Sequence, residues 1–416
     1  MEPPSKKRLF AVLLAAFLGW MFDGMEMGLF PQIARPALLQ MQQAQGLTIT
    51  DSFVGQWMGY TTAAFLIGAA LGGVVFGWLG DKIGRVRAMA ASILIYSLFT
   101  GCIYFAEVPW HLAALRFLAA LGMGGEWSLG VALVMEVWPE KHRPLMAGII
   151  GAAANVGFAL IAVIAIFFEV TVDSWRWVAL VGAAPALLTF LIRLFVPESE
   201  KWQHAVTTRK TPNRPLRDIF GPGILKYTLL ATALSSVVLI GTWGSVQWLP
   251  LWADKMAGVD DPSAKGYTGM LSGVGAIVGC LLGAWIGKFI SRRVAYFLLS
   301  LGSLVLCGAL FRMVDTYGTT FLVLTFLVGA FTAAFYGWLP LYLPELFPTR
   351  MRATGQGLAF NAGRILAAAG AVYGGQLVQA FDGSYARAGA IITLIYVIGM
   401  VVIWFAPETK GKPLPD

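Results

Sequence analysis

Six ionisable side chains interrupt otherwise apolar stretches of this sequence and are the residues best placed to do chemistry there. They are Asp23, Glu26, Arg116, Glu126, Arg193 and Arg364. An ionisable group surrounded by hydrocarbon is costly unless it is paired or faces water, so each is a candidate functional residue. A buried carboxylate can take up a proton and release it when a cation or water approaches, and a guanidinium can hold a carboxylate through two parallel hydrogen bonds. The set therefore suits proton exchange combined with binding of an anion.

The three acidic residues of this set are the candidates for proton coupling. Asp23 lies roughly 21 Å along a helix that starts near Leu9, and Glu26 shares its face at the i+3 position. Glu126 is expected near the middle of another span, with Arg116 about 15 Å further toward the outside. Two alternatives to proton coupling stay open. In the first, Glu26 is simply solvated near the outer surface. In the second, Asp23 and Glu126 are structural partners of Arg116.

Arg364 is the only charge predicted at mid-depth in the second half of the chain, and Asn361 shares its helix face at i−3. The guanidinium can capture a carboxylate, and Asn361 can add a hydrogen bond to a hydroxyl or an amide. In the alternative, Arg364 pairs with a helix carbonyl or an acid and only holds helices together. The other side chains predicted to contribute to a substrate site are Arg116, Asn155, Trp243, Gln247 and Tyr336.

The composition dictates what must position these residues. Of 416 residues, 58% are hydrophobic and only 12% are charged, which excludes most water-soluble folds. Apolar runs of about 20 residues are long enough to cross a bilayer as helices. We therefore expect an all-α integral membrane protein with twelve transmembrane helices, over residues 9–34, 54–79, 88–106, 110–138, 145–168, 176–196, 225–252, 267–287, 294–313, 319–343, 353–380 and 387–406.

The positive charge of the chain alternates with these spans. The segments on one side carry 21 of the 30 Lys and Arg residues, whereas those on the other side carry six. Because Lys and Arg are retained on the cytoplasmic side of short loops, both termini are predicted to be cytoplasmic, in the inner (plasma) membrane. The charges form no single stripe, so a nucleic-acid partner is not expected.

The two halves of the chain repeat. Three short patterns recur in the same order at offsets of 207 to 210 residues, beginning at Trp78 and Trp285, at Glu136 and Glu345, and at Pro197 and Pro407. Parallel repeats of this kind are typical of transporter folds built from duplicated halves. The predicted organisation is a six-helix bundle over 1–196, a cytoplasmic linker over 197–224 and a second six-helix bundle over 225–416.

These motifs carry a family resemblance. The first repeat resembles the loop signature of the major facilitator superfamily, Gly77-x-x-Gly80-Asp81-Lys82-x-Gly84-Arg85. The segments around Arg116 to Trp127 and Pro197 to Trp202 are similar to the metabolite:proton symporter branches. Gly19-Trp20-x-Phe22-Asp23-Gly24-x-Glu26 most resembles the sialate:proton symporter family, although Glu26 stands where aspartate is common. The resemblance implies proton-coupled uptake of a small organic anion.

Charged residues at the inner helix ends are predicted to form a gate. Three pairs are expected, Asp81 with Arg85, Glu136 with Arg143, and Glu345 with Arg352. By resemblance they close the inner side in the outward-facing state. The alternative is a set of solvated topology charges, since exposed pairs contribute only about 0–1 kcal/mol. Lys288 replaces Asp81 in the second repeat, which predicts a weaker pairing there.

The sequence gives no support for an enzyme, a metal site or a bound cofactor, because it has no histidine–cysteine cluster with metal-ligand spacing and no phosphate-binding glycine loop. We expect a monomeric proton symporter that imports an organic anion, a sugar acid such as sialic acid first. A monocarboxylate or aromatic acid is the next candidate. A uniporter or exchanger of a neutral solute is the alternative from another mechanistic class.

Overall fold

In the computed structural model, helices form the fold. The structure describes residues 6–44, 46, 51–167, 170–185, 192, 195–207, 214–257, 264–381 and 384–415, and these residues contain no β-strand. Within them, ten helices are long and apolar enough to cross a membrane. Helix α16 (Arg352–Ala380) has 29 residues and covers the predicted eleventh span, and the predicted sixth span lies partly outside the described residues. The helices agree with the predicted spans within a few residues at most boundaries, but α1 extends well beyond its predicted end.

The first half contains the helices α1 (Lys6–Ala44), α2 (Asp51–Ile83), α3 (Arg85–Cys102), α4 (Pro109–Met123), α5 (Glu126–Val137), α6 (Arg143–Phe167) and α7 (Trp175–Val181). Two short helices follow in the linker, α9 (Glu200–Thr207) and α10 (Pro215–Asp218). The second half contains α11 (Leu225–Gly244), α12 (Leu249–Ala257), α13 (Ala264–Phe289), α14 (Arg292–Met313), α15 (Thr319–Tyr342), α16, α17 (Tyr385–Ile392) and α18 (Ile395–Val402).

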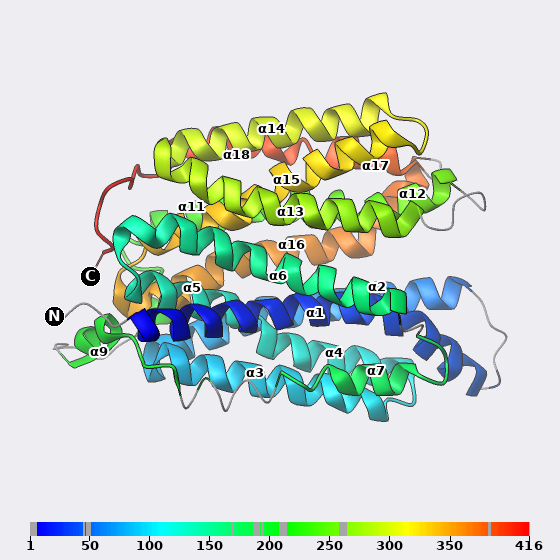
Figure 1. The fold of residues 1–416 in the computed structure, drawn as a ribbon, viewed down its shortest axis with the longest axis horizontal. Helices are drawn as coiled ribbons and strands as arrows, with labels where there is room; N and C mark the ends of the chain where they lie inside the picture. Colours follow the sequence, from blue (N-terminus) through cyan, green and yellow to red (C-terminus); the bar gives the residue numbers. More distant parts are fainter. Residues whose placement is uncertain are drawn as a thin grey trace.

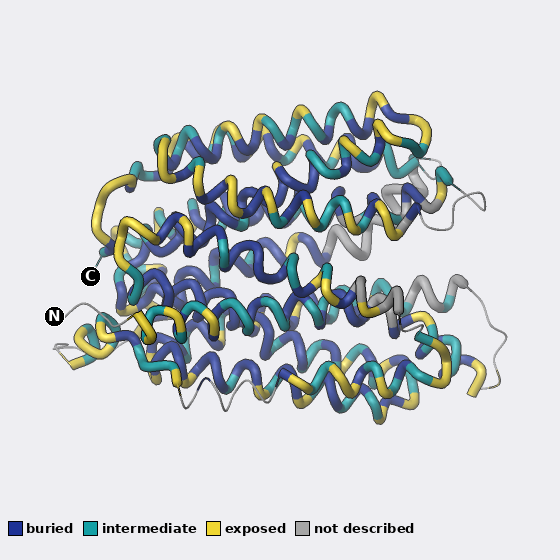
Figure 2. The backbone as a smooth tube through the Cα atoms, viewed as in Figure 1, coloured by how far each residue is buried: buried dark blue, intermediate teal, exposed yellow. Residues whose placement is uncertain are grey.

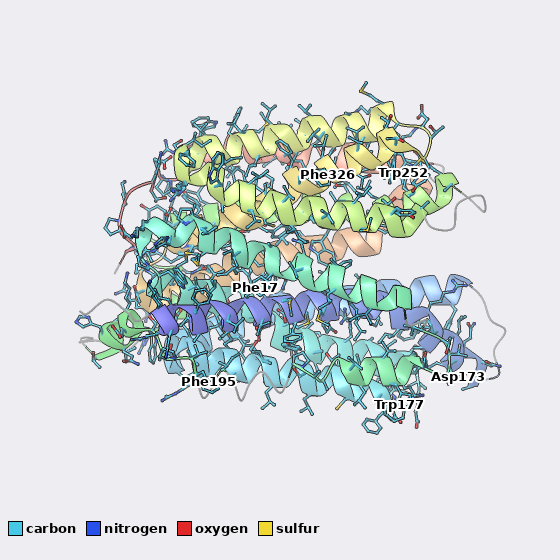
Figure 3. All side chains as sticks on the ribbon, in the orientation of Figure 1. Phe17, Asp173, Trp177, Phe195, Trp252 and Phe326 are labelled. Carbon is cyan, nitrogen blue, oxygen red and sulfur yellow. The ribbon has the colours of Figure 1, made fainter. Side chains whose placement is uncertain are left out.

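The long helices run along one axis, with both chain termini and α9 at the same end (Figure 1). We call this the terminal end and the other the opposite end, where Asp173 and Trp177 lie (Figure 3). The halves meet along two seams. Helix α2 packs on α16 at one seam, and α6 packs on α13 and α15 at the other. Buried residues concentrate between the helices, and exposed residues lie along the outer helices (Figure 2).

Glycines let the helices approach backbone to backbone. A Cβ at Gly68 or Gly72 of α2 would overlap main-chain carbonyls of α4, and Gly279 and Gly283 of α13 lie in the same way against α15. Both glycine pairs have the small-xxx-small spacing that favours close helix packing in membranes. The close packing expected from this spacing in the sequence is therefore present.

Three predicted spans are interrupted. The seventh breaks between Gly244 and Leu249, where the glycines and Pro250 predict a loosened helix. The twelfth breaks between α17 and α18. The fourth was expected as one helix over 110–138, but it ends as α4 at Met123 and restarts as α5 at Glu126. Gly124 and Gly125 lie at this break, and glycine tolerates such interruptions because it carries no side chain.

We expect Gly279→Ala to lower the thermal unfolding midpoint, because the new methyl group would overlap the carbonyl of Ala330. The overlap should cost about 1–3 kcal/mol. Gly273→Ala is the matched control, since nothing lies within 4 Å of its added Cβ in the same helix. Both gain the same helix propensity, so equal midpoints in detergent would contradict the packing.

Candidate functional site

Asp23 and Glu126 lie together at mid-depth in the first half. Both are almost fully buried, and none of their four carboxylate oxygens has a hydrogen-bond partner in the described part of the chain. The carboxylate of Glu126 lies against Gly19 of α1, one helical turn before Asp23. Asp23 is close enough to Glu126 and to Arg364 for their charges to interact. Two acids and one arginine thus form a buried group that includes residues from both halves.

Arg364 of α16 is held by its neighbour Asn361. Its Nη1 donates to Oδ1 of Asn361 over 2.7 Å, whereas its Nε has no partner. Asn361 donates through Nδ2 to the carbonyl of Gly357 (2.9 Å) and to that of Gly124 in the first half (3.3 Å). Asn361 is fully buried. Both of its N–H donors are therefore used, which leaves none for the substrate hydroxyl or amide expected from the sequence.

Aromatic rings surround this group. Phe360 of α16 stacks on Trp127 of α5, with ring centroids 3.9 Å apart and planes 16° apart. Trp20 of α1 and Tyr336 of α15 meet Phe360 edge-on, with centroids at 6.4 and 6.3 Å. The guanidinium carbon of Arg364 lies 5.4 Å from the centre of the Phe360 ring. We call these four rings, with Asp23, Glu126, Asn361 and Arg364, the central cluster.

Glu26 and Arg116 form a separate buried pair between α1 and α4. Arg116 Nη1 binds Oε1 of Glu26, and its guanidinium carbon lies 4.3 and 4.5 Å from the rings of Phe30 and Phe65. Only 4% of Glu26 and 3% of Arg116 is exposed. The expectation that Glu26 is solvated is therefore wrong. Arg116 is paired with Glu26, so it is not the partner of Asp23 or Glu126.

The remaining side chains predicted for the substrate site are placed differently. Tyr336 belongs to the central cluster, where it meets Phe360. Asn155 of α6 donates to the sulfur of Cys280 over 3.7 Å and so lies in the seam between α6 and α13. Trp243 is partly buried against the core. The side chain of Gln247 lies outside the described residues.

A second, fully buried cluster joins the halves at the terminal end. Arg85 binds Asp81 (2.7 Å) and Glu136 (3.0 Å), and Arg352 of the second half binds the same Glu136 oxygen (2.9 Å). Asp81 also accepts hydrogen bonds from the backbone N–H groups of Ala353 (3.3 Å) and Thr354 (2.8 Å), at the start of α16. We call these groups the terminal-end cluster.

This pairing differs from the predicted one. Glu136 was expected to pair with Arg143, and Glu345 with Arg352, each within its own repeat. Instead Arg143 binds Glu140 (3.1 Å), and Glu345 binds Arg292 (2.8 Å). The reason is geometric, because the helix ends of the two halves meet here and Glu136 reaches both arginines at once. Only Asp81 with Arg85 pairs as predicted.

The second repeat lacks the carboxylate that crosses between halves. Arg292 and Glu345 stand where Arg85 and Glu136 stand in the first repeat, and they form the equivalent bond. Lys288 occupies the position of Asp81 and is exposed. Asp81 reaches the start of α16, whereas Lys288 cannot accept a hydrogen bond from the start of α6.

Two carboxylates follow Pro197 and Pro407, where the third repeated pattern begins, and the sequence alone predicts no role for them. Glu198 accepts from the N–H of Arg85 (2.9 Å) at the start of α3, and Glu408 accepts from that of Arg292 (3.0 Å) at the start of α14. Burial raises the pKa of Glu198 despite these bonds. Burial acts in the same direction on Glu408, but backbone N–H bonds outweigh it and lower its pKa. The repeated Pro-Glu motif was the available signal.

The geometry combines two packed helical halves, mid-membrane acids and an arginine, and a charge cluster between the halves. The family model described as Major Facilitator Superfamily matches residues 9–371. The chain belongs to the Major Facilitator Superfamily. Membership makes it a transporter of metabolites rather than an enzyme.

Relatives from this superfamily match almost the whole chain. A putative metabolite transport protein of Haemophilus influenzae is 31% identical, over 97% of each chain. A probable 4-methylmuconolactone transporter of Cupriavidus pinatubonensis is 29% identical, over 98% of this chain and 92% of the relative. The sialic acid transporter NanX of Escherichia coli is 28% identical, over 87% and 85%.

A solved superfamily structure shares the fold. The proton:xylose symporter XylE matches with a TM-score of 0.78 and 19% identity, over 98% of both chains. This likeness supports the arrangement of twelve membrane-spanning helices as two bundles.

We expect Glu26→Gln to destabilise the protein by about 3–5 kcal/mol, because it leaves the Arg116 charge buried without a partner. The double variant Glu26→Gln, Arg116→Met should recover most of this loss, since no charge remains. Thermal unfolding in detergent measures both. Glu140→Gln is the control, because the Glu140 carboxylate that binds Arg143 is exposed, and it should cost no more than about 1 kcal/mol. A Glu26→Gln variant as stable as this control would contradict the buried pair.

Proposed function

We propose that this chain is a proton-coupled symporter that imports a small organic anion, and that a planar, unsaturated carboxylic acid is its first candidate substrate. The observation that supports this proposal is the central cluster. It combines one arginine, two acids that form no ion pair among the described residues, and four aromatic rings, and both halves contribute to it. Each chain carries the whole cluster, which supports a monomeric transporter.

Arg364 is the proposed anion-binding residue. Its Nε has no hydrogen-bond partner within the described structure, and Asn361 fixes the other side of the guanidinium. A buried guanidinium with free donors can bind a carboxylate through two hydrogen bonds. Such a contact compensates the arginine charge and selects anions over neutral solutes. This favours an anion symporter over the neutral uniporter or exchanger.

The surroundings of Arg364 favour a flat acid over a sugar acid. Trp20, Trp127, Tyr336 and Phe360 offer ring faces and edges, which suit stacking on a planar substrate. A sugar acid presents many hydroxyl groups, yet the donors of Asn361 are already used. The probable 4-methylmuconolactone transporter of Cupriavidus pinatubonensis, which is 29% identical, agrees with this choice. A sugar acid is the second candidate because the sialic acid transporter NanX is 28% identical.

Asp23 and Glu126 are the proposed proton-binding residues. Glu26, which is paired with Arg116, is a further proposed proton-binding residue. An unpaired carboxylate in a low-dielectric interior is costly as an anion, and proton binding removes that charge. The neighbouring Arg364 links the state of Asp23 to the bound anion. In the proposed cycle the acids are protonated from outside, the anion binds Arg364, and the halves then rock.

The terminal-end cluster is the proposed inner gate. Its bonds join α2 and α5 to α16, so they must break before the halves can part at this end. The excess of Lys and Arg in the same loops supports a cytoplasmic location of both termini, in the inner membrane. The structure then corresponds to a state closed toward the cytoplasm.

Uptake into proteoliposomes tests the substrate class. With an inward proton gradient, we expect accumulation of labelled cis,cis-muconate or benzoate, competed weakly by sialic acid. Arg364→Lys should weaken uptake about tenfold or more, because lysine cannot offer the bidentate fork.

Arg387→Lys is the matched control for Arg364→Lys, since Arg387 is exposed near the start of α17. It should transport like the wild-type protein. Unaltered affinity in Arg364→Lys would remove Arg364 from the site. Accumulation of sialic acid alone would reverse the order of the two substrate candidates.

Coupling is tested at Asp23. We expect Asp23→Asn to lose accumulation against a gradient while it retains exchange of labelled for unlabelled substrate, because the amide cannot carry the proton across. Comparing the two assays in the same vesicles separates coupling from binding. Undiminished accumulation in Asp23→Asn would overturn the assignment of Asp23.

A further inference from the structure

Asn361 connects three groups that belong to different parts of the proposed mechanism. It accepts from the Arg364 guanidinium (2.7 Å), and it donates to the carbonyls of Gly357 (2.9 Å) and Gly124 (3.3 Å). Gly124 belongs to the first half, whereas the other two belong to α16 of the second half. The amide also packs against Gly73 of α2 so closely that a Cβ there would overlap it. Asn361 is thus clamped between α2, the end of α4 and its own helix.

The bond to Gly124 has a local cause. Because the fourth span breaks after Met123, the ladder of i to i+4 hydrogen bonds is interrupted there, and helix-end carbonyls need other donors. A buried carbonyl without a donor is costly. Asn361 supplies the donor for Gly124 from the opposite half. The break is therefore stabilised by a residue that moves with α16.

The same break presents a proposed proton site. Glu126 is the first residue of α5, two positions after Gly124. The ionisable groups near Glu126 and Asp23 are each other, Tyr96 of α3 and Arg364 of α16, while Arg364 also faces Tyr336 of α15. A single amide side chain thus bridges the arginine to the backbone that carries Glu126.

We propose that Asn361 is the positioning residue that couples proton binding at the α4–α5 break to anion binding at Arg364. The inference rests on the proposed function and deepens it. While the terminal end is closed, Asn361 holds both the guanidinium and the Gly124 carbonyl. When α16 separates from α5, the bond to Gly124 breaks and the Arg364 side chain loses a fixed support. Proton release and anion release are thereby tied to the same movement.

The test compares substrate affinity at acidic and alkaline pH. Exchange is measured in proteoliposomes with equal pH on both sides, using cis,cis-muconate, benzoate or sialic acid, whichever the wild-type protein accumulates. If proton and anion sites are coupled, the apparent wild-type KM should rise about 5- to 150-fold from acidic to alkaline pH. In Asn361→Leu we expect exchange to persist and this rise to shrink below about twofold, because the bridge is lost.

Gln356→Leu is the matched control. Gln356 is another fully buried amide of α16, and its amide nitrogen and oxygen have no hydrogen-bond partner in the described residues. This variant should keep the pH dependence of the wild type. If Asn361→Leu does not fold, Asn361→Ser serves instead, because a hydroxyl is too short to bridge the two groups.

The outcomes separate this inference from the proposed function. If the wild-type protein exchanges none of the acids, both the proposed function and this inference are overturned. If the wild-type protein transports and the Asn361 variant keeps the same pH dependence, only this inference is overturned. It is also overturned by a folded variant that loses exchange at every pH, since Asn361 would then only orient Arg364.

Discussion

The cost of burying charge governs this structure. At the terminal end, Arg85, Glu136 and Arg352 are fully buried but mutually bonded, so attraction offsets their loss of hydration. At mid-depth, Asp23 and Glu126 are equally buried, but neither carboxylate forms an ion pair within the described part of the chain. Charges that only held helices together would be expected to be paired in the same way. This contrast between the two clusters supports a different role for each, as the proposed gate and the proposed binding site.

Duplication explains why the clusters look related yet differ. Each half forms the same ion pair at its own helix ends, Arg85 with Glu136 in the first half and Arg292 with Glu345 in the second. In each half a glutamate also accepts a hydrogen bond from the start of the third span, Glu198 in the first half and Glu408 in the second. The bonds from Asp81 to the start of α16 have no counterpart in the second repeat, since Lys288 stands at the equivalent position. The Glu136–Arg352 pair joins the halves through residue types that both repeats share.

Helices and their order could be predicted from the sequence because apolar runs and repeat offsets are local signals. The fourth-span break escaped prediction, since a Gly-Gly pair inside a membrane helix is also compatible with simple close packing. The pairing at the terminal end could not be predicted, because Glu136 and Arg352 are 216 residues apart in the sequence and no spacing rule relates them. The burial of Glu26 could not be decided from the sequence, because counting residues along α1 gives the height of a side chain but not which neighbour covers it. Phe360 carried no signal among 27 phenylalanines.

The two seams between the halves are held by different forces. Where α2 and α5 meet α16, an ion pair and the N–H groups of a helix start would have to be rehydrated for the contact to open. Between α6 and the helices α13 and α15, Gly148 and Gly151 lie against main chain, and the described polar contacts are weak ones to the sulfur of Cys280. Such a surface can slide without exposing charge. We therefore expect the contact of α2 and α5 with α16 to open only when its charged groups are rehydrated, and the contact of α6 with α13 and α15 to move without that cost.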